Sequence, residues 1–343
     1  MTNNLFTRFK YRLAVVIAAL SSLVLMAVAC SKPGDDQIDV YNPTPTPFVK
    51  PINFPDPVYD FSANPLTKEG FELGRKLFYD GRLSKDGSIS CGSCHKQANA
   101  FSDDKVFSLG VDGKTGTRNS TTIINMAWSS SFFWDGREAH LDEQPLHPIQ
   151  NPVEMNETLP NVINKLKQDA VYKSMFKRAF GSEEITQANM LKALSQFMIQ
   201  CTSTNSKYDS VQRSQGAVFT TEEQAGRTLF KQLCSPCHSG ELFTDNKFHT
   251  NGIKPGVFND SGRYLVTQNI SDVYFFKTPS LRNVMQTAPY MHDGRFATMS
   301  EVLDHYITTG IGIHTNEKAK LIAFLNTLTD KTFLENPKLA KQQ

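Results

Sequence analysis

The chain has 343 residues, of which 39% are hydrophobic, so it is long enough to bury two or three compact cores of its own. Its formal net charge is +2 at pH 7, and three cations, Arg8, Lys10 and Arg12, lie within the first 12 residues. Without these three the charge is −1, which leaves no basic footprint for a protein that binds nucleic acid.

The first segment is typical of a secretory signal. An uncharged stretch over residues 13–29 follows the three cations and ends at Ala27-Val28-Ala29-Cys30. We interpret Cys30 as the lipidated first residue of a lipoprotein, with residues 1–29 as the signal peptide. The same residues also suit ordinary signal peptidase or an uncleaved anchor, because the stretch is nearly long enough to span a bilayer. Each alternative places the rest of the chain in the periplasm or cell envelope, with membrane contact only through an N-terminal lipid or signal anchor.

Residues 30–60 carry seven prolines among polar residues, which predicts an extended, Pro-rich tether. These are Pro33, Pro43, Pro45, Pro47, Pro51, Pro55 and Pro57.

Two Cys-x-x-Cys-His motifs follow, and their cofactor-binding residues are Cys91, Cys94, His95, Cys234, Cys237 and His238. In each motif, two thiols can add to the vinyl groups of one haem while the adjacent histidine binds the iron. A redox dithiol or half of a zinc site would need a strand–helix–strand pattern or a second pair of closely spaced ligands, and neither accompanies these motifs. The sequence therefore predicts two covalently attached c-type haems.

Cys201, outside both motifs, is predicted to be a buried apolar residue.

Apolar residues follow helical spacing after residue 67, over residues 162–180 and 185–198, and again over 318–328. Gly181 is a plausible stop for the first of the middle segments. Alternation typical of strands is nearly absent, so the predicted fold is mainly α.

The chain also repeats itself. Residues 74–78 (Gly-Arg-Lys-Leu-Phe) resemble residues 226–230 (Gly-Arg-Thr-Leu-Phe), and residues 119–143 align without a gap to residues 277–301. We therefore expect two cytochrome c-like domains related by internal duplication, each with one c-type haem. The N-terminal domain would span residues 61–212 and the C-terminal domain residues 213–343.

Together these motifs resemble the bacterial di-haem cytochrome c peroxidase family, which includes the tryptophan-oxidising maturation enzyme of methylamine dehydrogenase. The resemblance runs over residues 64–328. Besides the haem motifs it depends on Phe133-Trp134-Asp135-Gly136-Arg137, Leu141-Asp142-Glu143-Gln144, Asn151-Pro152-Val153-Glu154-Met155 and Thr287-Ala288-Pro289-Tyr290-Met291-His292-Asp293-Gly294. Members reduce hydrogen peroxide at the N-terminal haem and pass electrons through the C-terminal haem.

The resemblance implies three catalytic residues. Glu154 matches the acid–base carboxylate, Gln144 the amide that orients peroxide or water, and Trp134 the indole that relays charge between the haems. Taken alone, Glu154 would be a solvated loop acid and Trp134 a core residue. Their spacing, with Gln144 ten residues and Glu154 twenty residues after Trp134, favours the catalytic interpretation.

The sixth ligand of the first haem is predicted to be absent. Many family members have a histidine sixteen residues after the motif histidine, where this chain has Val111, and no histidine lies between His95 and His140. We expect a five-coordinate or water-bound iron, with His140 or His147 as ligands if the expectation is wrong.

The sixth ligand of the second haem has more than one candidate. Met291 suits the usual methionine ligation of c-type cytochromes. The family register instead selects Tyr306, fourteen residues after His292, where ordinary peroxidases have methionine and the tryptophan-oxidising enzyme has tyrosine. We prefer Tyr306, with Met291 and His305 as alternatives. By analogy alone, the resemblance also implies one calcium ion, held by Asn119, Thr287 and Pro289.

Three functions follow in order of preference. The first is a peroxidase that takes electrons from a small periplasmic cytochrome c or cupredoxin. The second is a peroxide-dependent oxidase that modifies residues of a partner protein, favoured by Tyr306 and Val111. The third is a plain di-haem electron carrier. The sequence leaves a homodimer open.

Overall fold

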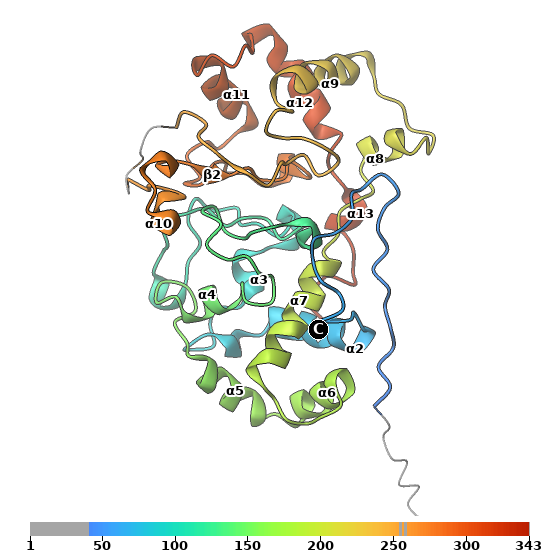
Figure 1. The fold of residues 1–343 in the computed structure, drawn as a ribbon, viewed down its shortest axis with the longest axis vertical. Helices are drawn as coiled ribbons and strands as arrows, with labels where there is room; N and C mark the ends of the chain where they lie inside the picture. Colours follow the sequence, from blue (N-terminus) through green and yellow to red (C-terminus); the bar gives the residue numbers. More distant parts are fainter. Residues whose placement is uncertain (1–40, 254–255, 257–258, 343) are drawn as a thin grey trace, which may run out of the picture. The chain divides into compact units, whose positions relative to one another are not determined.

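The computed structural model describes residues 41–253, 256 and 259–342 (Figure 1). The predicted signal peptide and Cys30 lie outside the described residues. The described residues from Pro43 onward belong to one compact unit, which is mainly helical, as predicted. No helix in this described part is both long and apolar enough to cross a bilayer.

The helices of the unit lie in two groups, with α9, α11 and α12 at one end and α2, α5, α6 and α7 at the other (Figure 1). The longer helices are α2 (Lys68–Phe78), α5 (Leu159–Lys167), α6 (Ala170–Phe180), α7 (Gln187–Gln200), α9 (Thr221–Leu233), α11 (Met299–Thr308) and α12 (Lys318–Asn326). The shorter ones are α3 (Cys91–Cys94), α4 (Leu146–Gln150), α8 (Lys207–Gln212), α10 (Tyr264–Thr267) and α13 (Lys331–Leu334). Single 3-10 turns are η1 (Gly81–Leu83), η2 (Gln97–Asn99), η3 (Val111–Gly113), η4 (Met126–Trp128), η5 (Ile270–Asp272), η6 (Val284–Gln286) and η7 (Thr315–Glu317).

The sheet of the described residues is one antiparallel pair, β1 (Phe248–His249) with β2 (Phe276–Lys277). The predicted helices are confirmed. The helical pattern over residues 162–180 is interrupted, however, because Asp169 caps a new helix by accepting a hydrogen bond from the Val171 amide. Gly181 ends α6 in the left-handed conformation, with φ of 80°, as predicted for a stop residue.

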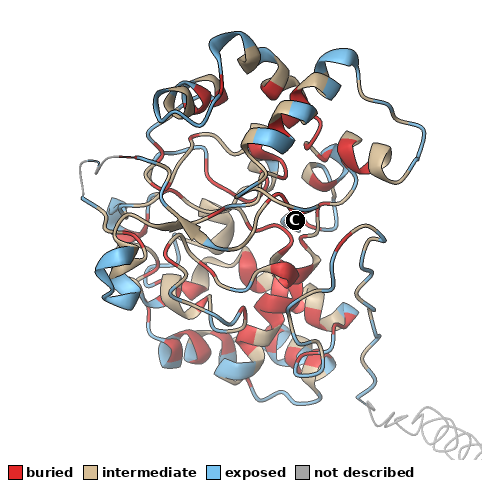
Figure 2. Cartoon of the chain, turned by 45° about the horizontal axis from the view of Figure 1, so that its top comes forward, coloured by how far each residue is buried: buried red, intermediate tan, exposed pale blue. Residues whose placement is uncertain are grey.

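The first core forms where α2 crosses α7. Gly74 allows this crossing, because a Cβ atom there would lie 1.9 Å from the Ala193 carbonyl oxygen. Leu73, Leu77 and Phe78 are fully buried beside it. Figure 2 shows the general pattern, in which helices carry buried residues on one side and exposed residues on the other.

The second core repeats this arrangement where α9 crosses α12. A Cβ atom at Gly226 would lie 1.9 Å from the Lys320 carbonyl oxygen, the same distance as at Gly74. The aromatic contacts also correspond. Phe78 and Phe197 have ring centroids 4.8 Å apart in the first core, and Phe230 and Phe324 are 5.1 Å apart in the second.

Two asparagines provide a further correspondence. Asn125 and Asn283 both adopt left-handed backbone conformations, with φ of 53° and 58°, immediately before η4 and η6. The Asn125 side-chain oxygen accepts from the Ser203 amide at 2.9 Å, and the Asn283 side-chain oxygen accepts from the Asp330 amide at 2.7 Å. These matched contacts support the internal duplication, and the division at residues 212 and 213 stays a prediction.

The C-terminal residues return to the first core. Phe333 of α13 and Leu339 are buried among first-core residues. The Tyr79 hydroxyl donates to the Leu339 carbonyl at 2.9 Å, and the Gln97 amide donates to the Asn336 carbonyl at 2.8 Å. The last segment therefore ties the two ends of the unit together.

The predicted tether is wrong for residues 43–60, which pack against the folded unit. Phe54 is buried, and the rings of Phe48 and Phe54 each lie 5.2 Å from the ring of Trp128. The Trp128 indole donates to the Pro55 carbonyl at 2.9 Å. Aromatic residues between the prolines bury enough apolar surface to offset the entropy of ordering this segment.

Candidate haem cavity and peroxidatic site

One cavity of about 660 Å³ brings together residues of both Cys-x-x-Cys-His motifs. Its lining includes Cys94, His95, Cys234, Cys237 and His238. The remaining predicted residues that line it are Trp134, Gln144, Glu154, Met291, Tyr306, Asn119, Thr287 and Pro289. Residues predicted from two distant parts of the sequence therefore meet around one space.

The two motif histidines are prepared for metal binding in the same way. His95 contacts the Phe101 carbonyl oxygen through Nδ1 at 2.9 Å, and His238 contacts the Phe243 carbonyl oxygen through Nδ1 at 3.1 Å. This contact assigns the proton to Nδ1 and leaves Nε2 free to bind iron. Burial lowers the pKa of both imidazoles, which favours the neutral form that ligation needs.

The first motif begins a short helix. Ser90 and Ser93 cap α3, and this turn places Cys91 and Cys94 three residues apart on one side of the segment before His95. Cys201, in contrast, is fully buried, and burial raises the pKa of its thiol well above the ordinary value. It is therefore an inert core residue, as predicted.

Lys277 supplies a cation to the same cavity. Its ammonium donates to the Ser129 hydroxyl at 3.0 Å and to the Ser131 carbonyl at 2.5 Å. Burial lowers the pKa of this ammonium to about 8, and no carboxylate among the described residues pairs with it. A buried cation with neutral partners fits an anionic group such as a haem propionate. The neutral imidazoles and this cation therefore fit the predicted haems.

Glu154 faces this cavity from the loop after α4. The Asn151 amide donates to Glu154 Oε1 at 2.6 Å, and the Glu154 carbonyl accepts from the Val111 amide at 2.8 Å. Gly110 permits this approach, because a Cβ atom there would lie 2.2 Å from the Val153 carbonyl oxygen. Burial raises the pKa of the Glu154 carboxyl, partly offset by Asn151, Arg137 and His147. The residue is therefore not a solvated loop acid.

The residues considered for the sixth position of the first haem do not line the cavity. Val111, which occupies the position of the family histidine, is buried. His140 is exposed, and His147 contacts Glu138 Oε2 through Nε2 at 3.1 Å. None of the three belongs to the cavity lining. In the described residues of the first half, His95 is the histidine that lines the cavity, and the open coordination position stays a prediction.

Trp134 is held in the cavity wall. Its indole donates to the Asn119 carbonyl at 2.9 Å, and its own carbonyl accepts from the Lys277 amide at 2.8 Å. Its ring lies 6.5 Å from the ring of His292, the residue that matches it in the second half. The other tryptophan, Trp128, also lines the cavity, but it is 2% exposed and belongs to the first core. The relay role of Trp134 stays a prediction.

Two of the three candidate ligands for the second haem line the cavity. Tyr306 and Met291 both do so, and Asn251 lies beside them. Its amide is 3.4 Å from Met291 Sδ, and its side chain acts to lower the pKa of Tyr306. Burial raises the pKa of Tyr306 to about 12. His305 contacts the Asn251 carbonyl through Nε2 at 2.9 Å and does not line the cavity. Tyr306 and Met291 remain the two candidates.

The three predicted calcium ligands all line the cavity, but their arrangement does not test the ion. The Asn119 amide donates to the Lys105 carbonyl at 2.9 Å, and the Asn119 backbone amide donates to the His292 carbonyl at 2.7 Å. No cluster of three or more acidic, histidine or cysteine ligands occurs among the described residues. The resemblance implies ligation by the Asn119 side chain and by the backbone carbonyls of Thr287 and Pro289, which belong to none of these classes. Calcium therefore stays a prediction.

Sequence reasoning missed Lys277 and a buried network around Arg118. Arg118 donates to Asp135 at 2.6 Å and to Asp260 at 2.6 Å, and it lines the cavity. The internal alignment contained a signal for Lys277, because Lys277 occupies the position that Asn119 has in the first half, and the residue type changes there from an amide to a cation. It contained none for Asp260, which lies outside the repeated segment.

Comparisons with known proteins agree with this site. A sequence model of the di-haem cytochrome c peroxidase family matches residues 68–217. The methylamine utilization protein MauG of Methylorubrum extorquens is 36% identical over 296 residues, which cover 82% of this chain and 83% of that protein. Cytochrome c551 peroxidase of Nitrosomonas europaea is 35% identical over 284 residues, which cover 80% of this chain and 84% of that protein.

A solved structure has the same fold. It is that of a MauG-like protein associated with microbial copper homeostasis, which is 32% identical and aligns with a TM-score of 0.80. The alignment covers 86% of this chain and 99% of that chain.

A mainly helical unit whose cavity joins two Cys-x-x-Cys-His motifs, with a half-buried carboxyl group facing it, defines a di-haem c-type oxidoreductase. The chain belongs to the di-haem cytochrome c peroxidase family. The family predicted from the sequence is confirmed, and with it an enzyme of the cytochrome c peroxidase type that carries two c-type haems. Relatives named as peroxidases and relatives named MauG are similarly close to this chain.

Proposed function

We propose that the protein reduces hydrogen peroxide to water with electrons from a small periplasmic cytochrome c or cupredoxin. The electrons would enter at the C-terminal haem and reach the N-terminal haem by way of Trp134. The observation that carries this proposal is the placement of Glu154 and Gln144 in the lining of the cavity that also contains His95. No other histidine of the described first half lines that cavity, and this supports an iron position open to peroxide at this haem.

The reaction consumes two electrons and two protons for each peroxide and yields two waters. The haems, when bound, supply the electrons and the iron position for peroxide. Cleavage of the O–O bond also needs a proton moved from one peroxide oxygen to the other, which is the task of a general acid–base. Because Asn151 occupies Oε1 of Glu154, Oε2 remains available for that proton. The raised pKa of Glu154 brings its two protonation states closer in free energy at neutral pH.

Gln144 and Trp134 would act beside Glu154. The Gln144 amide can both donate and accept hydrogen bonds, so it can orient peroxide or water against the carboxyl group. Trp134 is fixed through its indole N–H and its own carbonyl, which limits the reorganisation that a change of its charge would require. A rigid indole in the wall of a cavity shared by both motifs is suited to relay electrons.

A second candidate is a peroxide-dependent oxidase that modifies residues of a partner protein. Tyr306 favours it, because phenolate ligation stabilises higher-valent iron, and Tyr306 lies in the cavity beside Cys234 and Cys237. The 36% identity to a protein named MauG supports the same candidate. A plain electron carrier is third, and the carboxyl group of Glu154 in the cavity lining argues against it.

We also propose that the mature protein lies in the periplasm or cell envelope, attached through a lipid on Cys30. The secretory pattern of residues 1–29 and the export that covalent haem attachment requires support this location. The calcium ion at Asn119, Thr287 and Pro289 is part of the same proposal, supported by the presence of all three residues in the cavity lining.

Stopped-flow absorption of the purified holoprotein tests the proposal. The protein is mixed with one equivalent of peroxide and then with reduced cytochrome c. Rapid reoxidation of the cytochrome with two electrons consumed per peroxide supports the peroxidase. A long-lived oxidised species that does not react with cytochrome c or cupredoxin would contradict the peroxidase and support the oxidase. No reaction with peroxide at all would restore the electron carrier.

A further inference from the structure

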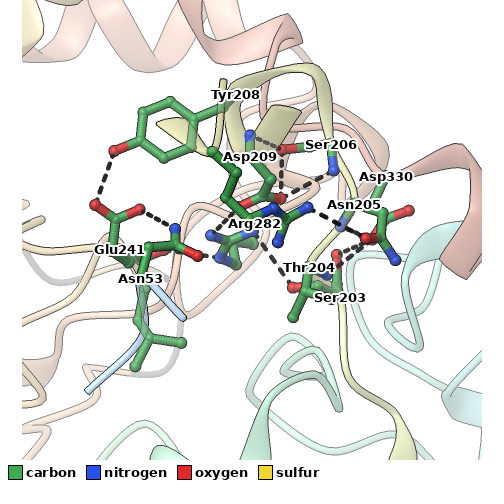
Figure 3. Close-up of polar contacts among 12 residues, drawn as sticks. Asn53, Ser203, Thr204, Asn205, Ser206, Tyr208, Asp209, Glu241, Arg282 and Asp330 are labelled. Atoms are coloured by element: carbon green, nitrogen blue, oxygen red, sulfur yellow. Dashed lines mark hydrogen bonds and ion pairs between the residues drawn. The ribbon is translucent and has the colours of Figure 1, made fainter. Parts of the chain in front are cut away.

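The second half of the chain contains a buried ion pair where the first half is apolar. Arg282 aligns with Ile124 in the internal repeat. The side chains of Arg282 and Asp209 are both 0% exposed, and two nitrogens of the guanidinium donate to the two oxygens of the carboxylate at 2.8 and 2.9 Å (Figure 3). Bidentate pairing of this kind fixes the position of the guanidinium plane.

The third nitrogen of the guanidinium reaches the loop that follows the second haem motif. Arg282 Nε donates to the Glu241 carbonyl at 2.8 Å. The guanidinium also lies 5.9 Å from the ring centroid of Phe243 and 4.5 Å from that of Phe54. Phe243 supplies the carbonyl that contacts Nδ1 of His238. Arg282 therefore binds the carbonyl two residues before the one that orients the second motif histidine.

The Glu241 side chain is held from the other side (Figure 3). The Asn53 amide donates to Glu241 Oε2 at 2.8 Å, and the Tyr208 hydroxyl lies 3.4 Å from Oε1. Both the backbone and the side chain of residue 241 are thus anchored.

The corresponding loop in the first half is held differently. Thr122 donates to the Ala100 carbonyl, and the matching Ser280 donates to the Leu242 carbonyl at 2.6 Å, so this anchor is common to both halves. The Phe101 carbonyl, however, also accepts from the Ile123 amide at 3.2 Å.

The Phe243 carbonyl lacks that second partner. Within the described residues, it receives no corresponding hydrogen bond from the Leu281 amide. Phe243 and the matching Phe101 both adopt left-handed backbone conformations, with φ of 54° and 57°, which are unfavourable for residues with a side chain and persist only where neighbours hold them. The Ile123 amide holds the loop in the first half, and in the second half Arg282 holds it through the Glu241 carbonyl.

We propose that Arg282, held by Asp209, is a positioning residue for the second haem: it fixes the Glu241–Phe243 loop so that the Phe243 carbonyl holds the Nδ1 proton of His238. A firm hydrogen bond from Nδ1 makes the imidazole a stronger electron donor, and this favours the ferric state of the iron. Loss of the constraint would weaken that bond and raise the reduction potential of the second haem. The inference rests on the proposed role of His238 as an iron ligand.

A charge-neutral double variant tests the inference. Arg282→Met with Asp209→Asn removes the pair without changing the net charge, so any effect on the haem does not come from an uncompensated buried charge. Asparagine at position 209 keeps an oxygen for the Ser206 cap of α8. Arg282→Lys is the conservative companion, because a lysine keeps the charge but cannot bridge Asp209 and Glu241 at once. Tyr172→Phe, which removes a first-core hydrogen bond to Asp80, controls for general destabilisation.

Two measurements are made. Spectroelectrochemistry gives the reduction potentials of both haems. Proton NMR of the ferric holoprotein resolves the shifted Nδ1 proton of an iron-bound histidine, so its exchange with solvent can be followed. In the double variant we expect the equilibrium constant for reducing the second haem to increase about tenfold, which is about 59 mV for one electron. We also expect faster exchange of the His238 proton. Arg282→Lys should shift both in the same direction by less, and the first haem and Tyr172→Phe should not change.

Two results would contradict this expectation in different ways. If both variants bind two haems and keep the wild-type potential and exchange rate, Arg282 does not position His238. If the double variant fails to bind haem, the test uses Arg282→Lys alone. A wild-type potential of the second haem and a wild-type exchange rate of the His238 proton in that variant would contradict the inference. If the wild-type protein shows no iron-bound histidine at the second haem, the assignment of His238 fails first, and the proposed function fails with it.

Discussion

Glu154→Gln keeps the shape of the side chain and removes its ability to carry a proton. Glutamine can still accept the 2.6 Å hydrogen bond from the Asn151 amide, and the backbone contact to the Val111 amide is unaffected. The variant should therefore fold and bind both haems. Because a positioned acid–base group contributes about 10²–10⁴-fold to a reaction, kcat/KM for peroxide should fall by about that factor. The corresponding increase in the activation barrier is roughly 3–5 kcal/mol.

Stopped-flow kinetics over a range of pH measure this effect. Burial raises the pKa of the Glu154 carboxyl, so wild-type activity that needs the carboxylate should fall as the pH is lowered through this raised pKa. The variant should lack that limb of the profile. Glu143→Gln is a matched control, since Glu143 is exposed and precedes Gln144, and its rate should match wild type. Turnover by Glu154→Gln within about twofold of wild type, less than 0.5 kcal/mol in the barrier, would refute the acid–base role.

Four other variants have defined expectations. Trp134→Phe should slow electron transfer between the haems in flash-reduction experiments while leaving peroxide binding intact, and an unchanged rate would exclude the relay. Tyr306→Met should raise the reduction potential of the second haem, because a thioether favours ferrous iron, and a potential equal to wild type would favour Met291 as the ligand. Lys277→Met removes a cation from the cavity and should lower a haem potential, whereas Lys277→Arg should preserve it; equal potentials in both would mean that Lys277 meets no haem carboxylate. Gly226→Ala should lower the free energy of unfolding by about 3 kcal/mol in denaturant titrations because its Cβ atom would meet the Lys320 carbonyl, while Gly116→Ala, which meets no atom within 4 Å, should be nearly neutral.

Features that depend on short stretches of sequence were predictable. The Cys-x-x-Cys-His motifs place both thiols and the imidazole within five residues, so their chemistry needs no knowledge of the fold. Helices such as α2 and α7 follow from apolar spacing because each buries one face. The repeated segments align Asn125 with Asn283, and the matched hydrogen bonds of these two residues agree with that alignment.

Features that depend on distant contacts were not predictable. The proline content of residues 43–60 hid the burial of Phe54, because composition does not show that Trp128 lies opposite. The return of α13 to the first core involves partners more than 200 residues apart, such as Gln97 and Asn336. The pairing of Arg282 with Asp209, 73 residues away, likewise has no local signal.

The central claim is that the protein carries two haems and that one iron is open to peroxide on the side of Glu154. Low-temperature EPR of the ferric holoprotein during a cyanide titration, with haem quantified as pyridine haemochrome, tests it most directly. The account predicts two haems per chain, with one high-spin signal that converts to low spin as cyanide binds and one low-spin signal that does not change. Fewer than two haems, or two low-spin signals that cyanide leaves unaltered, would contradict it.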